Sequence, residues 1–219
     1  MKKFWKKTSL FLVTAAMTVS APLMAWALEH DIVILHTNDI HCGINDNIGF
    51  AGLAQIKKDA LARTPNVALV DAGDAIQGAP IGKLSRGLAV VDIMNYLGYD
   101  FCIPGNHEFD YGMDRFLELV PLQRAGYYCA NFVYAGNNKQ VLPGYKIMQY
   151  EDTKVAFVGA STPESLTTST PTFFQNEKGQ YIYSFCEDKT GNKLYKQLQK
   201  NIDKARKEGA DYVFIVGHL

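Results

Sequence analysis

The segment Gly105-Asn106-His107-Glu108-Phe109-Asp110 follows a short apolar run, Phe101-Cys102-Ile103, after one proline. Two earlier polar segments, Thr37-Asn38-Asp39-Ile40-His41 and Ala72-Gly73-Asp74, likewise come one residue after apolar runs. Together the three segments supply carboxylates, an amide and imidazoles, which are the oxygen and nitrogen ligands that divalent cations take in proteins. The pattern therefore predicts a metal-dependent site built at the ends of strands.

Helical and extended patterns alternate along the chain. Apolar residues recur at helical spacing in four stretches, 52–63, 90–97, 113–125 and 193–207. Within the third stretch, Pro121 predicts a kink or a break. Strands are predicted at 31–36, 67–70, 101–103, 127–130 and 212–216, and a hairpin at 145–150 and 154–159. This alternation predicts an α/β domain with parallel strands.

The candidate ligands share one position relative to the predicted strands. Asp39, Asp74 and Asn106 each lie just past a predicted strand end, and His218 follows the last strand. Ligands of parallel α/β sheets gather at the carboxyl ends of the strands. We therefore expect these four side chains to meet at one edge of the fold.

The spacing around the first two segments supports this interpretation. Asp39 and His41 are two residues apart in an extended segment, which places a carboxylate and an imidazole on the same side. Gly73 allows the backbone to turn sharply and present the carboxylate of Asp74. Asp71 still belongs to the strand end, so we expect it to form hydrogen bonds rather than to bind a metal.

The third segment combines a potential ligand with a potential catalytic group. Asn106 can offer a neutral amide oxygen to a metal, and His107 can face a substrate. Asp110 is close enough in the chain to hold the His107 imidazole in one tautomer. We expect Glu108 to cap a helix or form a salt bridge, and His36 to be a packed structural histidine.

The N-terminal 27 residues have the pattern of a secretory signal. Residues 1–7 are basic, residues 8–24 are largely apolar, and Ala25-Trp26-Ala27 is an A-x-A cleavage site. We expect a signal peptide at 1–27 and an exported mature chain, periplasmic or extracellular. An uncleaved membrane anchor is the alternative, but the apolar stretch is short and the cleavage site well placed, so no stable anchor is expected.

The charge composition excludes an obvious class of partner. The 219 residues carry 22 Lys+Arg and 22 Asp+Glu, and the lysines are scattered among the acids. Proteins that bind nucleic-acid polymers gather basic residues on one face, so we expect no such partner. The length after the signal suits one domain with a substantial core.

The cysteines leave two alternatives open. Cys42, Cys102, Cys129 and Cys186 allow three full disulfide pairings in an exported chain, and Cys102 and Cys129 fall on predicted strands that can be neighbours. The other alternative is that they are small buried thiols. Cys42 is adjacent to His41, and neighbouring side chains of an extended segment point apart, so we expect it not to be a ligand.

Four of these segments resemble the signature of the calcineurin-like metallophosphoesterase superfamily, and more closely of its periplasmic and cell-surface 5′-nucleotidase family. The family motifs H-T-N-D-x-H, G-D, G-N-H-E-F-D and G-H occur here, in order, at 36–41, 73–74, 105–110 and 217–218. The resemblance covers 31–219. It implies a metallophosphoesterase-type β-sandwich flanked by helices.

The resemblance also implies a site. Two divalent metal ions, Zn²⁺, Mn²⁺, Mg²⁺ or Co²⁺, would be bound by five residues. These ligands are Asp39, His41, Asp74, Asn106 and His218. The first two would bind one ion, the last two the other, and Asp74 would bridge both. His107 would be the catalytic imidazole, and Asp110 would orient it.

The implied function is a phosphomonoester hydrolase of exported 5′-nucleotidase type. It would release phosphate from a small nucleotide or phosphomonoester through a hydroxide activated by two metal ions. A 2′,3′-cyclic-nucleotide 2′-phosphodiesterase/3′-nucleotidase is an alternative, because the signature does not separate the two activities. A non-catalytic remnant is a third alternative.

Two family features do not occur within the 219 residues. They are a later G-H-x-H-type segment and the C-terminal nucleotide-binding domain. We therefore expect 28–219 to be a partial metallophosphoesterase catalytic domain, incomplete at the C-terminus. Whether such a truncated chain is active is left open by the sequence.

Overall fold

The computed structural model describes residues 31–219. The predicted signal peptide at 1–27 lies outside the described residues. Among the described residues, no helix combines the length and the apolar character needed to cross a bilayer.

The first sheet consists of three parallel strands in the order β1-β2-β3. They are β1 (Val33–Thr37), β2 (Val67–Asp71) and β3 (Phe101–Cys102). Every residue of β2 is buried, because this central strand is covered on both faces. That burial explains why its sequence is continuously apolar before Asp71. The predicted parallel arrangement is confirmed, and each strand ends within a few residues of the start of one of the polar segments.

Three helices cover one face of the first sheet. They are α2 (Gly49–Leu61), α4 (Leu88–Leu97) and α5 (Met113–Leu119). Leu53, Met94 and Phe116 from these helices join Leu69 of β2 in one buried cluster. The third helix ends earlier than the predicted 113–125, and the 3₁₀ turn η2 (Val120–Leu122) follows. The predicted break at Pro121 is confirmed, since proline lacks the N–H that a continuing helix needs.

The second sheet has the order β5-β6-β8. The predicted hairpin is confirmed by the antiparallel strands β5 (Tyr145–Tyr150) and β6 (Thr153–Ser161). The strand β8 (Tyr212–His218) pairs with β6 in parallel, and this register places His218 opposite Ser161. The long helix α7 (Asn192–Lys207) packs on this sheet through Leu194 and Leu198.

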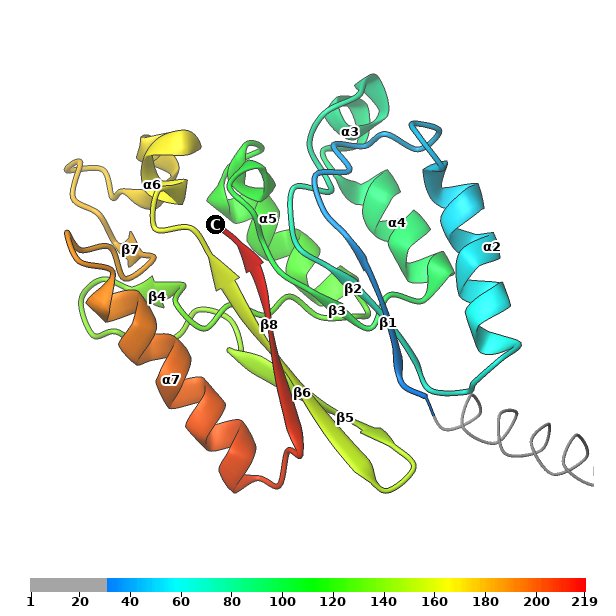
Figure 1. The fold of residues 1–219 in the computed structure, drawn as a ribbon. Helices are drawn as coiled ribbons and strands as arrows, with labels where there is room; N and C mark the ends of the chain where they lie inside the picture. The colour runs from blue at the N-terminus through cyan, green and yellow to red at the C-terminus, as the bar shows by residue number, and fades with distance from the viewer. Residues whose placement is uncertain (1–30) are drawn as a thin grey trace, which may run out of the picture.

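The two sheets pack face to face. Their shared core contains Ala68, Val70, Phe101, Ile103, Val155, Phe157 and Val216. Along β2, Val70 therefore faces the second sheet while Leu69 faces the helices, as the two-residue alternation of a strand requires. Helices α2 and α4 flank one side of the pair of sheets and α7 the other (Figure 1). The expected sandwich flanked by helices is confirmed.

The remaining elements are short. They are α3 (Pro80–Ser85), η1 (His107–Phe109), β4 (Val133–Tyr134), α6 (Ser165–Thr168), η3 (Pro171–Phe174) and β7 (Tyr183–Ser184). Strands β4 and β7 form a separate antiparallel pair.

The predicted strand at 127–130 is wrong. Three successive N–H groups, those of Tyr128, Cys129 and Ala130, donate to carbonyls of three separate segments, at Cys102, Pro143 and Gly159. A continuous ladder with one partner strand is therefore absent, although Tyr127 forms an isolated bridge with Cys102. The segment instead links the two sheets. A Cβ on Gly159 would lie 2.2 Å from the Tyr128 carbonyl oxygen, so this close approach requires glycine.

The four cysteines are free and buried. A disulfide between Cys102 and Cys129 is not formed, and the alternative of small buried thiols holds. The Cys129 sulfur lies 3.3 Å from both the Asn131 side-chain oxygen and the Ser161 hydroxyl. Burial raises the pKa of the Cys129 thiol, which keeps it protonated and unreactive.

Phe109 anchors the polar segment that carries His107, and its loss should destabilise the fold. The ring is fully buried and packs against those of Phe116, Phe132 and Phe174 at centroid distances of 4.8, 5.5 and 5.1 Å. We expect Phe109→Ala to lower the free energy of unfolding by about 3–5 kcal/mol in urea titrations. The matched control Tyr96→Ala removes a ring that is 91% exposed and should change it little. Equal effects of the two substitutions would contradict this packing.

Candidate active site

The segments after β1 and β2 continue to pair beyond the ends of the strands. The N–H groups of Asp39, His41 and Cys42 donate to the carbonyls of Gly73, Asp74 and Ala75 at 3.0, 2.9 and 3.0 Å. This parallel run of bonds keeps the two polar segments side by side. It fixes Asp39 and Asp74 as close neighbours at the carboxyl edge of the sheet.

The backbone at three predicted ligands lies in the left-handed region. The φ angles are 51° at Asp39, 47° at His41 and 59° at Asp74. Residues with a side chain adopt this region at a cost of roughly 1–3 kcal/mol each, and such residues cluster at functional sites. The bonds between the two segments hold these residues in place.

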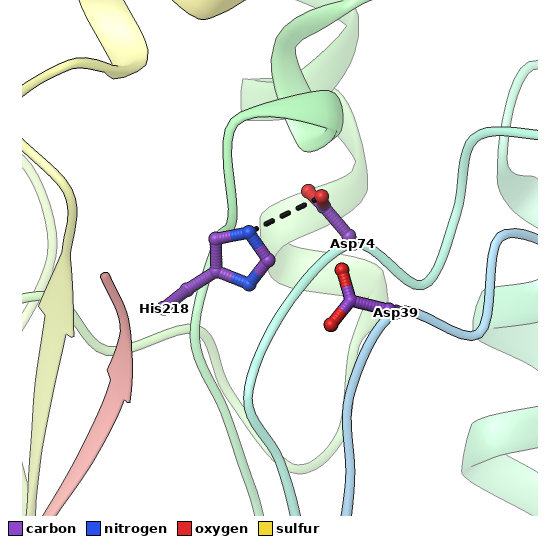
Figure 2. Close-up of side chains that lie close together, drawn as sticks. All are labelled: Asp39, Asp74 and His218. Carbon is purple, nitrogen blue, oxygen red and sulfur yellow. Dashed lines mark ion pairs between the residues drawn. The ribbon is translucent and has the colours of Figure 1, made fainter.

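Asp39, Asp74 and His218 form a potential metal-binding group. One ligand atom from each lies within 4.8 Å of the others. The Nε2 atom of His218 is 3.2 Å from Oδ2 of Asp74. Figure 2 shows the three side chains pointing toward one another from three separate segments of the chain. Three of the four side chains that the sequence predicts to meet therefore converge.

Two imidazoles direct Nε2 toward these carboxylates. Nδ1 of His218 contacts the Ala72 carbonyl at 2.9 Å, and Nδ1 of His41 contacts the Gln77 carbonyl at 3.2 Å. A carbonyl oxygen only accepts, so each Nδ1 carries a proton, and Nε2 is the nitrogen of each ring that would face a cation. Nε2 of His41 lies 3.8 Å from Oδ1 of Asp39 and 3.9 Å from Oδ2 of Asp74.

Asp74 occupies the centre of the group. Its Oδ1 accepts the His107 backbone N–H at 2.8 Å, which leaves Oδ2 facing the two imidazoles. Burial raises the pKa of this carboxyl, but the hydrogen bonds from His218 and His107 outweigh burial and lower it. The hydrogen bond with Asp74 raises the pKa of His218 to about 9, and burial opposes this. The carboxylate is therefore ionised and strongly attractive to a cation.

His107 and Asp110 form the predicted pair beside this group. Nδ1 of His107 lies 2.7 Å from Oδ2 of Asp110, and the His107 ring is 5.2 Å from the ring of His41. Burial lowers the pKa of His107. The hydrogen bond with Asp110 and the negative charge of that carboxylate outweigh burial, so the pKa is raised overall. The Ser169 hydroxyl donates to Oδ1 of Asp110 at 3.1 Å. Ser169 lies in a loop 59 residues away, and no sequence pattern pointed to it.

Asn106 is the predicted ligand with the least direct support. It is half-buried at the start of η1, directly before His107. Within residues 31–219, no hydrogen bond joins its side chain to Asp74 or His218. Its role as a ligand remains a prediction from the sequence.

Two buried carboxylates, those of Asp71 and Glu108, form hydrogen bonds with the segments that carry the site residues. Asp71 accepts from the Thr37 hydroxyl at 2.7 Å and from the Gly73 N–H at 3.1 Å, which confirms the expected hydrogen-bonding role. Glu108 accepts backbone N–H groups on both sides of the site, and no ion pair involves it within the described residues. Of the two roles expected for Glu108, the salt bridge is not formed; the side chain binds backbone N–H groups instead. Burial raises the pKa of both carboxyls.

His36 is exposed rather than packed, so that expectation is also wrong. It shares a face of β1 with Ile34, and both line a cavity of about 550 Å³ between β1 and β8. The alternating side chain Leu35 packs against the helices instead. Asp39 and His218 also line this cavity, so it opens onto the metal-binding group.

A second cavity reaches the site from the side of Asp110. It has a volume of about 540 Å³ and is lined mainly by polar side chains, including Lys83, Tyr111 and Ser169. Asp110, the partner of His107, therefore lies at the wall of this polar cavity.

The residues present fit divalent cations. Asp39, Asp74 and His218 each offer one ligand atom within 4.8 Å of the others. Nε2 of His41 lies 3.8 and 3.9 Å from the two carboxylates, and contacts with backbone carbonyls orient both rings. This mixture of oxygen and nitrogen ligands suits Zn²⁺, Mn²⁺ or Co²⁺, and Mg²⁺ where oxygen ligands predominate.

Comparison with known proteins identifies the family of this chain. Residues 32–219 match the family model of calcineurin-like phosphoesterases. A snake venom 5′-nucleotidase of Gloydius brevicauda is 29% identical over 95% of this chain and 36% of its own length. A 2′,3′-cyclic-nucleotide 2′-phosphodiesterase/3′-nucleotidase of Haemophilus influenzae is 25% identical over 94% of this chain and 34% of its own.

A solved structure shares the fold. The crystal structure of a 5′-nucleotidase precursor from Thermus thermophilus superimposes with a TM-score of 0.71 at 24% identity, covering 86% of this chain and 37% of the other. This chain thus spans between 34% and 37% of the length of these three proteins.

Removing one imidazole should weaken metal binding. We expect His218→Ala to lower the affinity for Mn²⁺ by at least about tenfold in calorimetric titrations, because loss of even an outer partner of a metal site costs about 10–100-fold. His36→Ala is the matched control, since His36 is exposed and contacts neither carboxylate of the group. Indistinguishable affinities of the two variants would place the metal elsewhere.

Proposed function

Because this chain belongs to the calcineurin-like phosphoesterase family, we propose that it carries the catalytic part of a metal-dependent phosphomonoester hydrolase of 5′-nucleotidase type. One observation carries the proposal. Asp39, Asp74 and His218 converge from three segments beside a histidine that is hydrogen-bonded to a carboxylate at 2.7 Å. Relatives of this chain include 5′-nucleotidases.

The proposed ligands divide between two divalent ions. Asp39 and His41 would hold one ion, Asn106 and His218 the other, and Asp74 would contact both. The position of the Asp74 Oδ2 atom between the two Nε2 atoms supports this arrangement. When bound, such ions withdraw charge from phosphate oxygens and lower the pKa of a bound water.

The chain's own catalytic group is His107. Asp110 contacts its Nδ1 and favours the imidazolium, so Nε2 would carry a proton toward the substrate. That proton would stabilise charge on a phosphoryl oxygen or pass to the leaving alkoxide oxygen. Ser169 would keep Asp110 in the orientation that this transfer needs.

The proposed substrate is a nucleotide 5′-monophosphate. A 2′,3′-cyclic-nucleotide 2′-phosphodiesterase/3′-nucleotidase activity is the second candidate, because the relative from Haemophilus influenzae carries that name and matches 94% of this chain. Both reactions would use the same ligands and the same imidazole.

The proposed organisation follows from the sequence. Residues 1–27 would be a signal peptide that directs export to the periplasm or the extracellular space. Residues 28–219 would be part of a catalytic domain, and a nucleotide-binding domain would lie outside these 219 residues. The match to only 36% of the length of the snake venom relative supports this division.

Substitution of His107 tests the proposal. With Mn²⁺ present, we expect release of phosphate from 5′-AMP, and a fall in kcat of about 10²–10⁴-fold in His107→Gln, as loss of a general acid causes. His36→Gln should retain activity. The comparison of 5′-AMP with 3′-AMP and 2′,3′-cyclic AMP selects between the two candidate activities. Failure of the unaltered chain to hydrolyse any of the three would instead favour a non-catalytic remnant.

A further inference from the structure

We infer that Glu108 is a positioning residue that sets the spacing of the metal ligands by tying the segment after β2 to the segment after β3. This inference rests on the proposed function, since it concerns the residues proposed to hold the ions. Glu108 itself is 1% exposed and lies beneath the group.

The contacts of Glu108 are all with backbone N–H groups. Its Oε2 accepts from Asp74 at 2.7 Å and from Gly105 at 2.6 Å. Its Oε1 accepts from Ala75 at 2.8 Å and from Ile76 at 3.3 Å. One side chain thereby holds three successive residues of one segment and one residue of the other.

This arrangement requires a carboxylate. Four N–H donors share two oxygens, and an ionised carboxylate has acceptor sites for all of them and no hydrogen that would oppose them. Glutamine would keep one oxygen but would turn an NH₂ group toward two N–H donors. The hydrogen-bond pattern is therefore specific for the charged side chain rather than for its volume.

Joining two loops through a buried carboxylate has a cost in free energy. Within residues 31–219 no lysine or arginine pairs with Glu108, and its charge interacts unfavourably with that of Asp74. Burying an unpaired charge costs free energy that an apolar contact would not. Cations bound by Asp74 would compensate this negative charge. A buried carboxylate at this position is therefore better explained by a neighbouring metal site than by a structural role alone.

The two tied segments carry three proposed site residues. The Gly105 N–H binds Glu108 and the His107 N–H binds Asp74 at 2.8 Å, so both neighbours of Asn106 are held. The segments are also closely packed, since a Cβ on Gly73 would lie 2.5 Å from the Gly105 nitrogen. The Glu108 bonds thus set where Asp74, Asn106 and His107 lie relative to one another.

The test compares Glu108→Gln with the unaltered chain. We expect amide hydrogen exchange of Asp74, Ala75 and Gly105 to accelerate at least tenfold, measured by nuclear magnetic resonance without added metal. We also expect the Mn²⁺ affinity to fall at least tenfold, measured by calorimetry. Glu177→Gln, which alters an exposed glutamate, is the matched control and should change neither quantity.

A second pair of variants separates positioning from stability. Leu198→Ala truncates a buried side chain of α7, outside the cluster that holds Phe109, and should lower stability while keeping the Mn²⁺ affinity. Glu108→Asp keeps the charge but shortens the side chain, and it should lie between the unaltered chain and Glu108→Gln. If Glu108→Gln does not fold, Glu108→Asp carries the test through the same two measurements.

The outcomes distinguish this inference from the proposed function. If the unaltered chain binds Mn²⁺ and Glu108→Gln binds it with the same affinity, the positioning role is overturned and the proposed function is left intact. Unchanged amide exchange at Asp74 and Gly105 overturns it as well. A parent chain that binds no Mn²⁺ and hydrolyses no nucleotide overturns the proposed function, and the amide exchange then decides whether Glu108 joins the two segments.

Discussion

The parallel pairing of β1, β2 and β3 is the constraint on which the site depends. Parallel strands end at the same edge of a sheet, so the three polar segments that follow them must lie next to one another. The pairing extends into the loops through the bonds of Asp39 and His41 to Gly73 and Asp74. Backbone hydrogen bonds alone thus bring Asp39 and Asp74 next to each other, without any contact between their side chains.

The second sheet completes the group. Because β8 pairs with β6 in parallel, His218 is held opposite Ser161, and packing of the two sheets brings its Nε2 within 3.2 Å of Asp74. This contact joins residues 144 positions apart in the sequence (218 − 74). The apolar core between the sheets, including Val70, Phe157 and Val216, therefore positions the site as directly as its hydrogen bonds do.

Three carboxylates at the site are buried, although protein interiors usually hold apolar side chains. Asp71, Asp74 and Glu108 are all nearly inaccessible to water. Each accepts at least one backbone N–H, which offsets part of the cost of burying its charge. Burial, together with repulsion between these carboxylates, raises the pKa of Asp71 and of Glu108, and divalent cations beside Asp74 would offset that repulsion.

The sequence by itself determined most of the longer helices and strands and the meeting of Asp39, Asp74 and His218 past the strand ends, because apolar periodicity and polar segments after strands are local patterns. It failed at 127–130, where the backbone bonds to three different segments, and at His36, whose exposure depends on what packs against β1. The contacts of Glu108 with four N–H groups and of Ser169 with Asp110 were decided only by the tertiary structure. Such contacts join segments far apart in the chain, and their partners are backbone atoms or common side chains that leave no local pattern to read.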